Sequence, residues 1–310
     1  MNYPRVVEAF YNTPWAILPE KLADIQAFIE RKVIEPPLTH SEQMILDCMD
    51  RARAGMPPLS AGPRNGVMMH GRTAVLPVMG TISRRASMLS DASGGTSADA
   101  IQRNLESLVA DSGVRNIVMC FDSPGGSVAG MTELADCIRM MGQQKKIVGV
   151  ADSMAASAAY WLMSQCRECY ATPSGMVGSI GVIAAHTDTS KMEEAAGVKT
   201  TIISAGKYKA EREGPLTDDA KAHLQSLIDA AYGQFVGDVA KGRGVSEATV
   251  RSDYGQGRMM TAKDAKAAGL VDGVATLATV VSRMNGGTMA MAAVSKYDIA
   301  ARIAEIETQG

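Results

Sequence analysis

The chain has 310 residues, 46% of them hydrophobic and 21% charged, which is enough for one large α/β domain or for a domain with appendages. Its 31 lysines and arginines nearly balance 33 acidic residues, so the formal net charge is −2, and no segment is strongly basic. This balance argues against nucleic acid as the main partner, because binding to phosphates requires a concentrated positive surface.

The sequence shows neither a secretory signal nor a membrane span. The N-terminal residues lack a positive region followed by an apolar core. No apolar run reaches the ~18 residues that cross a bilayer, and the longest one, 147–163, is interrupted by Asp152. The cysteines include a single CxxC, Cys166 and Cys169, without a second pair to complete a zinc site. We therefore expect a soluble, cytoplasmic protein with reduced thiols, no metal and no cofactor.

Residues 1–60 are expected to form a helical arm at the periphery of the molecule. Leu22 and Ile25 belong to an apolar series with helical spacing. Residues 61–72 are rich in proline and glycine and are expected to form a linker. Nothing in this region suggests chemistry.

A βα rhythm begins at Thr73 and predicts a largely parallel sheet. The stretch TAVLPVMGTI is the first expected strand, and Pro77 indicates an edge or a bulge. NIVMCFD, 116–122, and KIVGVAD, 146–152, are continuous apolar runs, which are typical of strands buried on both faces of a parallel sheet. A helix is expected between them, at about 129–143.

The remaining elements complete a domain that spans 73–280. Further strands are expected at CYATP, SIGVIAA and KTTIIS. A long amphipathic helix ends at the glycines of KGRG, and TAKDAKAAGLVDG predicts one more short helix. Residues 281–310, rich at first in glycine, methionine and alanine, are expected to be a linker and an amphipathic tail.

Two segments that follow strands carry residues suited to acyl transfer. DSPGGS, 122–127, places adjacent glycines after a strand, where unshielded backbone N–H groups can stabilise an oxyanion. Ser157, in ADSMAASAAYW, follows the next strand among small residues that let other groups approach closely. Open α/β sheets place their sites at such strand ends. Each segment also has a plain structural interpretation, as a β-to-α turn and as a small helix residue.

Lysines and histidines are the candidates for a base beside Ser157. SAGKYKAERE contains Lys207 and Lys209, and a lysine that acts as general base needs its pKa lowered from ~10.4 towards ~7 by burial or by a cationic neighbour. The pattern alone does not decide between the two lysines. Among the histidines only His186 lies near an expected strand end, and a Ser–His–Asp triad with Asp188 is the alternative.

Together the motifs DSPGGS, MAASAAYW, GMVGSIGVI and SAGKYK, followed by KGRG and TAKDAKAAGLVD, resemble in their order the SppA-like (signal peptide peptidase A) serine peptidases. The resemblance covers roughly 73–272. It implies an α/β fold of the ClpP/crotonase type, a spiral of βα (ββα) units, and a Ser–Lys dyad. Because such domains usually assemble into rings or dimers, a homo-oligomer is expected.

The resemblance also assigns roles to individual residues. Ser157 is the nucleophile, and Lys209, which closes a Gly-x-x-Lys motif, is the general base. The resemblance implies that Ser179 orients the lysine and that the backbone N–H groups of Gly125 and Ala158 hold the oxyanion. Gly126 and Ala156 are the implied substrate-binding residues. Where the family often has Ser-Gly-Gly or Ser-Ala-Gly, this chain has Ser-Ala-Ala, which keeps the N–H for the oxyanion hole, so the resemblance does not fix the detailed shape of the specificity pocket.

The helical arm and the lack of a membrane anchor narrow the resemblance to the head maturation proteases of tailed phages, the lambda protein C-like group. Those proteases cut scaffold and sometimes portal protein inside the procapsid, so scaffold and portal protein are the expected partners. The tail is then a candidate start of a scaffold segment. Small residues around Ser157 suggest a pocket for side chains such as alanine, and self-cleavage is expected between about Gly287 and Ser295.

Two other functions are compatible with the sequence. A crotonase-like enzyme that binds acyl-CoA would use the same kind of backbone oxyanion hole. A non-catalytic scaffold or structural protein would retain a vestigial protease core.

Overall fold

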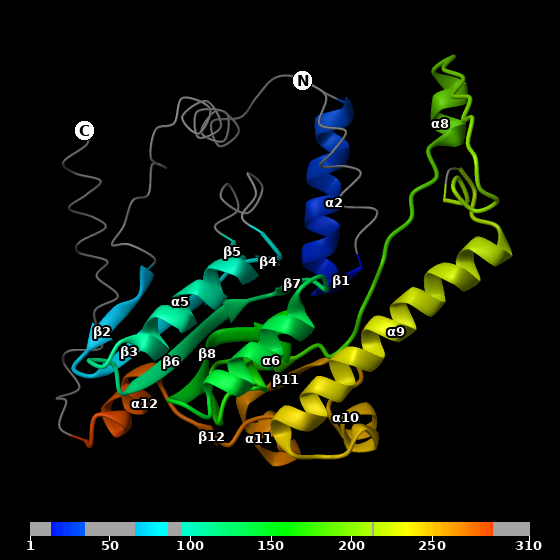
Figure 1. Cartoon of the computed structure of the whole chain (residues 1–310). Helices are drawn as coiled ribbons and strands as arrows, with labels where there is room; N and C mark the ends of the chain where they lie inside the picture. The colour runs from blue at the N-terminus through cyan, green and yellow to red at the C-terminus, as the bar shows by residue number, and fades with distance from the viewer. Residues whose placement is uncertain (1–13, 35–65, 86–94, 213, 288–310) are drawn as a thin grey trace, which may run out of the picture.

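The structure, a computed structural model, describes residues 14–34, 66–85, 95–212 and 214–287 (Figure 1). Most of the expected N-terminal arm and part of the expected linker lie outside these ranges. So does nearly all of the tail, including the expected self-cleavage segment beyond Gly287. Among the described residues, no helix is both long enough and apolar enough to span a membrane.

Within the described residues, eight strands form a mixed sheet whose main path has the order β11-β10-β8-β6-β3-β2, with β9 beside β8 and β12 beside β9. The strands are β2 Met68–His70, β3 Thr73–Met79, β6 Asn116–Ser123, β8 Lys146–Ala156, β9 Glu168–Ala171, β10 Met176–Gly178, β11 Met259–Thr261 and β12 Gly273–Val274. The central strands pair in parallel, whereas β2 and β11 are antiparallel edges.

A second, four-stranded sheet has the order β1-β7-β4-β5. Its strands are β1 Trp15–Ile17, β4 Ile82–Ser83, β5 Thr96–Ser97 and β7 Gly125–Ser127. The chain enters this sheet directly beyond the carboxyl ends of β3 and β6, so the small sheet extends from the edge at which the expected site residues gather.

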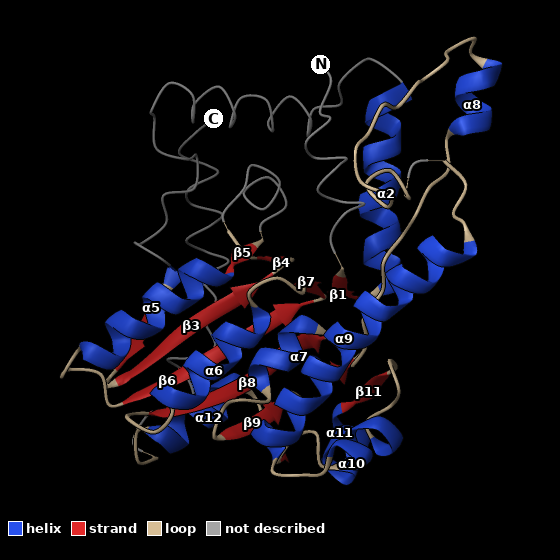
Figure 2. Cartoon of the chain, turned by 45° about the vertical axis from the view of Figure 1, so that its right-hand side comes forward, coloured by secondary structure: helices blue, strands red, loops and turns tan. Residues whose placement is uncertain are grey.

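Helices cover the main sheet on both faces (Figure 2). The helices of the described residues are α2 Pro19–Ile34, α5 Ala98–Ala110, α6 Met131–Met141, α7 Ala158–Met163, α8 Ser190–Ala195, α9 Asp218–Arg243, α10 Glu247–Asp253, α11 Ala262–Ala268 and α12 Leu277–Met284, of which α2 and α8 lie away from the main sheet. Ile117 and Met119 of β6 belong to the main core, which includes α5, α6, α7 and α9, whereas Val118 packs with Val280 and Val281 of α12. Alternate residues of one strand thus face different helices, as its continuous apolar sequence predicts.

Most of the expected elements of the domain are confirmed. The runs at 116–122 and 146–152 form parts of β6 and β8, and helix α6 lies between them. Pro77 pairs with β6, but β2 pairs only with residues 73–75 of β3, so Pro77 has a single strand neighbour in the register, like an edge residue. The fold is an α/β architecture with a largely parallel central sheet, as expected.

Two expected strands are wrong. SIGVIAA forms no strand beyond an isolated bridge at Ile183, and KTTIIS, 199–204, is exposed and irregular. Both stretches have β-branched residues, but a strand also needs a neighbour to receive its backbone hydrogen bonds. Residues 184–212 and 214–217, here called the projecting arm, instead leave the sheets and carry α8 outwards (Figures 1 and 2).

The N-terminal region contains a strand that the sequence analysis did not anticipate. Helix α2 falls within the expected helical arm, but the three residues of β1 before it pair antiparallel with β7, in the register Trp15 to Ser127 and Ile17 to Gly125. The part of this region that the structure describes therefore belongs to the small sheet.

Candidate active site

Ser157 occupies the junction between β8 and α7 in an unusual backbone conformation. Its φ is 52° and its ψ is −117°, a combination that side-chain-bearing residues rarely adopt. Its N–H donates to the carbonyl of Gly178 at 2.7 Å, and its own carbonyl accepts from the N–H of Trp161 at 2.9 Å. Such conformations cost on the order of 1–3 kcal/mol and persist only where the surroundings enforce them.

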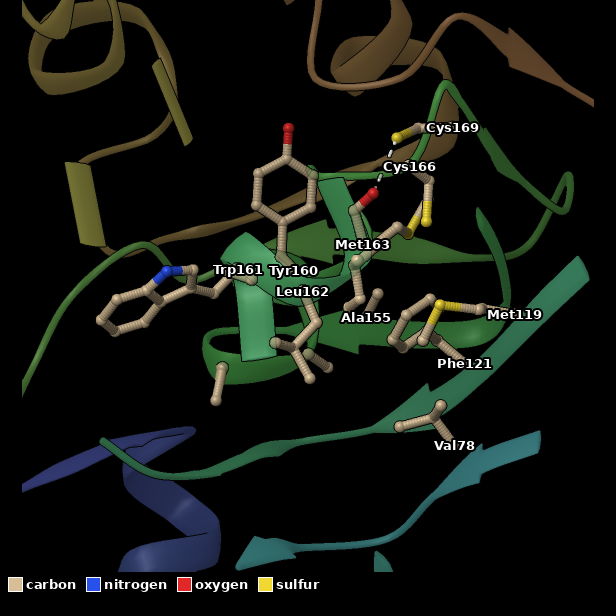
Figure 3. Packing of buried hydrophobic residues seen from close by; sticks show 14 of the residues in the cluster. Val78, Met119, Phe121, Ala155, Tyr160, Trp161, Leu162, Met163, Cys166 and Cys169 are labelled. Atoms are coloured by element: carbon tan, nitrogen blue, oxygen red, sulfur yellow. Dashed lines mark hydrogen bonds between the residues drawn. The ribbon is translucent and has the colours of Figure 1, made fainter. Parts of the chain in front are cut away.

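Helix α7 supplies that enforcement, because all six of its residues are buried. The ring of Trp161 stacks on Phe235 with centroids 4.4 Å apart, and its indole N–H donates to Asp238 at 3.0 Å. The hydroxyl of Tyr160 donates to the carbonyl of Leu270 at 2.9 Å. Figure 3 shows these two aromatic side chains leaving α7 in different directions. The helix is therefore anchored on several sides, and Ser157 with it.

The glycines of DSPGGS lie against the serine. At Gly125, with φ of 104°, an added Cβ would stand 3.0 Å from the Cβ of Ser157 and 2.3 Å from the carbonyl oxygen of Ala16. At Gly126 an added Cβ would stand 1.8 Å from the carbonyl oxygen of Ile82. Both positions exclude any side chain, because backbone approaches them from neighbouring strands. The two motifs that the sequence separates by some thirty positions thus meet in space.

Ser123 holds the glycine segment and was not anticipated as a site residue. Its hydroxyl donates to the carbonyl of Gly80 at 2.6 Å and accepts from the N–H of Gly125 at 3.2 Å. Its position inside the motif DSPGGS is the sequence feature that could have identified it as a site residue. The second expected oxyanion donor, Ala158, is the first residue of α7, so its N–H has no acceptor within the helix.

Ala156 and Ser179 lie beside the serine, and Gly126 lies in β7, next to Gly125. Ala156 ends β8 and pairs with Gly178, directly before Ser179, which has φ of 54° and is 4% exposed. Ser179 and Gly181 line a cavity of about 530 Å³ together with Ile17, Ile228 and Tyr232. The hydroxyl of Ser157 donates to the carbonyl of Gly181 at 3.4 Å, so the nucleophile is adjacent to this cavity.

The structure does not bring the expected base to the serine. Ser157 is fully buried, whereas Lys209 is exposed in the turn between α8 and α9 on the projecting arm. Its backbone N–H donates to the carbonyl of Gly206 at 3.1 Å. The Nζ of the neighbouring Lys207 lies 4.7 Å from the ring centre of Tyr208.

The Ser–His–Asp alternative is not assembled either. The Nε2 of His186 donates to the carbonyl of Gly214 at 2.8 Å. Asp188 accepts from the backbone N–H of Ser190 at 3.0 Å, and hydrogen bonds from Ser190 hold the pKa of this carboxyl below its usual range. Both side chains are thus engaged within the projecting arm.

The CxxC is part of the core. Cys166 and Cys169 are buried and not disulfide-bonded, and the Cys169 thiol donates to the carbonyl of Met163 at 3.1 Å (Figure 3). Burial raises the pKa of Cys169 to about 12, so the thiol stays protonated at neutral pH. The described ranges contain no group of three histidine, cysteine or acidic side chains arranged to hold a metal ion.

Two protein families match parts of this chain in a comparison with known families. Peptidase family S49 matches residues 139–290, which include Ser157, Ser179 and Lys209. The Clp protease family matches residues 71–177, which include the glycine segment and the nucleophile junction. The two profiles overlap across the junction of β8 and α7.

Similar full-length proteins include two from phages. The head-tail preconnector protein GP5 of Enterobacteria phage P21 is 29% identical over 93% of this chain and 60% of its own length. The capsid assembly protease C of Escherichia phage lambda is 32% identical over 74% of this chain and 55% of its own length. A putative signal peptide peptidase SppA of Enterococcus faecium is 30% identical over 54% of this chain and 49% of its own length.

The chain spans 60% or less of the length of these relatives, so they extend beyond the matched region. The profiles, the relatives and the geometry around Ser157 nevertheless agree on one assignment. Residues 71–290 of this chain are similar to the SppA-like serine peptidases: residues 139–290 match peptidase family S49, and residues 71–177 match the Clp protease family.

Proposed function

We propose that this protein is a serine endopeptidase in which Ser157 is the nucleophile and Lys209 the general base. The observation that carries the proposal is the enforced backbone of Ser157, at φ 52°, in contact with Gly125. A serine held at a strained strand-to-helix junction beside backbone N–H groups is suited to attack on a carbonyl. A purely structural serine would have no need of this conformation.

The chemistry follows from the groups at the junction. Neutral Lys209 takes the hydroxyl proton of Ser157 as Oγ attacks the scissile carbonyl, and the N–H groups of Gly125 and Ala158 hold the oxyanion. Each such donor is worth about 3 kcal/mol in comparable sites. The protonated lysine then gives its proton to the leaving amine, which departs as the acyl-enzyme forms. A water molecule, deprotonated by the same lysine, attacks the ester, and the lysine returns this proton to the departing Oγ of Ser157, which restores the free enzyme.

The position of Lys209 indicates that a second copy of the chain completes the site. The projecting arm exposes large apolar side chains; Ile203 is 95% exposed, Tyr208 55% and Val198 54%. Apolar surface of this kind is typical of an interface. Seating the arm on another copy would also bury the lysine, and burial lowers the pKa of an amine towards the neutral range. The lysine of one copy would then serve the serine of the next.

Mixing two inactive variants tests this arrangement. Ser157→Ala and Lys209→Ala should each be inactive, and a mixture that has been dissociated and reassembled should cleave peptide well above either alone. Recovery in the mixture requires that one site draws its serine and lysine from different copies. A mixture as inactive as its components, in an assembly shown to exchange subunits, would contradict the shared site.

Labelling with a fluorophosphonate tests the nucleophile itself. The reagent should acylate Ser157 in the wild-type protein, as measured by intact mass and peptide mapping, and the adduct should be absent from Ser157→Ala. A crotonase-like acyl-CoA enzyme or a vestigial core predicts no adduct at this serine.

For the natural substrate, we propose phage scaffold protein, with portal protein and the chain itself as further substrates. The support is the similarity to the phage P21 and lambda proteins. Incubation with a candidate scaffold protein, followed by mass spectrometry of the new termini, identifies the cleaved bonds. Ser157→Ala is the matched control, and identical scaffold termini in both reactions would contradict the assignment.

A further inference from the structure

Strand β1 lies between two backbone edges next to the nucleophile. On one side it pairs with β7, and this pairing continues at both ends through Leu18 N–H to the carbonyl of Pro124 at 3.0 Å and Val128 N–H to the carbonyl of Pro14 at 3.1 Å. On the other side Trp15 and Ile183 exchange two hydrogen bonds of 2.9 Å each. The segment therefore fills a slot that is one strand wide.

This slot passes directly beside Ser157. The Cα of Ile17 and the Cβ of Ser157 both stand 3.0 Å from the point where a Cβ of Gly125 would lie. Ile17 also lines the cavity that contains Ser179 and Gly181, and Gly181 accepts the hydroxyl of Ser157. A peptide presented to the nucleophile next to β7 would meet the backbone of β1.

The edges of the slot are suited to an extended peptide. The other side of β7 is already paired with β4, so the edge that β1 covers is the one on which a further strand could be added. Peptides commonly bind by adding a strand to such an edge through main-chain hydrogen bonds. A substrate strand and β1 would compete for the same N–H and C=O groups.

We propose that β1 is an autoinhibitory strand, which occupies the substrate slot and must leave it before a peptide reaches Ser157. The proposal rests on the peptidase function proposed above. It assigns to the N-terminal segment a regulatory role, in which exchange between β1 and an incoming peptide controls access to the nucleophile.

The groups at the site are in a resting arrangement with β1 in place. The N–H of Gly125 donates to Ser123, and the hydroxyl of Ser157 donates to Gly181. Neither group bonds to a carbonyl of β1. The strand therefore lies beside the nucleophile, but none of its peptide bonds is positioned for attack. An incoming substrate would draw both donors away from these partners.

Most of the apolar contacts of the segment lie outside the main core, to which Ala16 is the one residue of β1 that belongs. Ile17 and Leu22 form a small hydrophobic cluster of their own with Trp15, Ile25 and Ile183, separate from the main core. Prolines at 14 and 19 bound the strand and cannot donate to a ladder, which limits the number of hydrogen bonds that hold it. Release therefore costs a few hydrogen bonds, one small cluster and the burial of the small Ala16 side chain in the main core.

A reversible disulfide tests the proposal within one protein. Since residues 14 and 18 bond to β7 and Trp15 bonds to Ile183, Trp15 and Ser127 face each other as a non-hydrogen-bonded pair. Such pairs have Cα atoms about 4.5 Å apart, within the range of a disulfide. Trp15→Cys with Ser127→Cys, in a Cys48→Ser and Ser157→Ala background, should lock β1 in the slot when oxidised.

The readout is binding of a fluorescein-labelled peptide with the sequence of residues 13–19, TPWAILP. The oxidised protein should bind it at least about tenfold more weakly than the same protein after reduction. Ala16→Pro, which removes a ladder N–H, should bind it more tightly than wild type, whereas Ala16→Ser, which keeps the N–H, should not. Equal affinity in the oxidised and reduced states would overturn the proposal.

Because this assay uses the Ser157→Ala background, its outcome does not depend on catalysis. Fluorophosphonate labelling of the corresponding protein with Ser157 intact, in the reduced state, reports separately on the proposed peptidase. If the reduced protein is not labelled, this would count against the peptidase, while the peptide-binding ratio would still decide the role of β1.

Discussion

The two halves of the proposed dyad lie in contrasting parts of the molecule. Ser157 is fully buried between β8 and α7, and its backbone is fixed by contacts from several elements. Lys209 lies on the projecting arm, where large apolar side chains face outwards. A nucleophile in a strained conformation needs a rigid surround, which one chain provides, whereas a lysine that must become neutral needs burial, which the arm alone does not provide. Catalysis would thus depend on assembly.

The largest expected effect is the loss of activity when Ser157, the rigidly held half of the proposed dyad, is replaced. Ser157→Ala should lower kcat by at least about 10⁴-fold without loss of the fold, because the residual rate depends on binding and the oxyanion hole alone. Ser157→Gly should be equally inactive but at least as stable as Ser157→Ala, since glycine adopts positive φ without strain. Peptide cleavage and thermal unfolding measure the two effects. A lower Tm for the glycine variant than for the alanine variant would contradict the strained backbone.

The losses of stability caused by Gly125→Ala, beside Ser157, and by Gly197→Ala, in the projecting arm, compare the two regions directly. The first places a methyl 2.3 Å from a backbone oxygen at φ of 104°, and the second, at φ of 71° in the projecting arm, meets nothing within 4 Å. We expect a loss of roughly 2–4 kcal/mol of stability for Gly125→Ala, from overpacking and strain together. Gly197→Ala should lose about 1–2 kcal/mol, from left-handed strain alone. Urea unfolding measures both, and equal losses would contradict the close approach at β7.

Ile203→Asp tests whether the projecting arm, which carries Lys209, associates with a second copy of the chain. A charge at this 95% exposed side chain should leave the unfolding of the chain unchanged and weaken its self-association. We expect activity to fall about tenfold to 100-fold at low protein concentration and to recover as concentration rises. Light scattering coupled to gel filtration gives the oligomeric state. Full activity in a monomeric variant would contradict the shared dyad.

The smallest expected effect concerns two carboxylates with lowered pKa. Burial alone raises the pKa of Asp272, but hydrogen bonds from Arg243, at 2.8 and 3.1 Å, and from the Cys169 N–H more than offset it, so the net pKa is lowered. The stabilisation is therefore fully present above the unfolded-state pKa of about 3.9 and is lost as pH falls through the lower folded pKa.

Asp272→Asn should accordingly lower the Tm at pH 7 by about 2–4 °C, and the difference from wild type should shrink below pH ~4. Asp188, on the projecting arm, also has a lowered pKa but is fully exposed, so Asp188→Asn should leave the Tm unchanged. Scanning calorimetry across pH measures both variants. A constant difference between Asp272→Asn and wild type down to pH 2 would contradict the link to this carboxylate.

The sequence by itself determined the parts of this protein whose signals are local. Continuous apolar runs predicted β6 and β8, because strands buried on both faces have no polar side to display. Adjacent glycines and a serine among alanines indicated the segments around Gly125 and Ser157, because positions that backbone approaches closely admit only small residues. Tertiary contact then explained why no other residue fits at Gly125.

Tertiary structure alone decided the rest. Trp15–Ile17 became a strand because β7, more than a hundred residues away, offers it an edge. The expected strand at 179–185 is reduced to the single bridge between Ile183 and Trp15, and 199–204 forms no strand. The separation of Lys209 from Ser157 likewise depends on where the arm projects. A strand, unlike a helix, satisfies its backbone only through a neighbour, so its existence depends on contacts that no local pattern encodes.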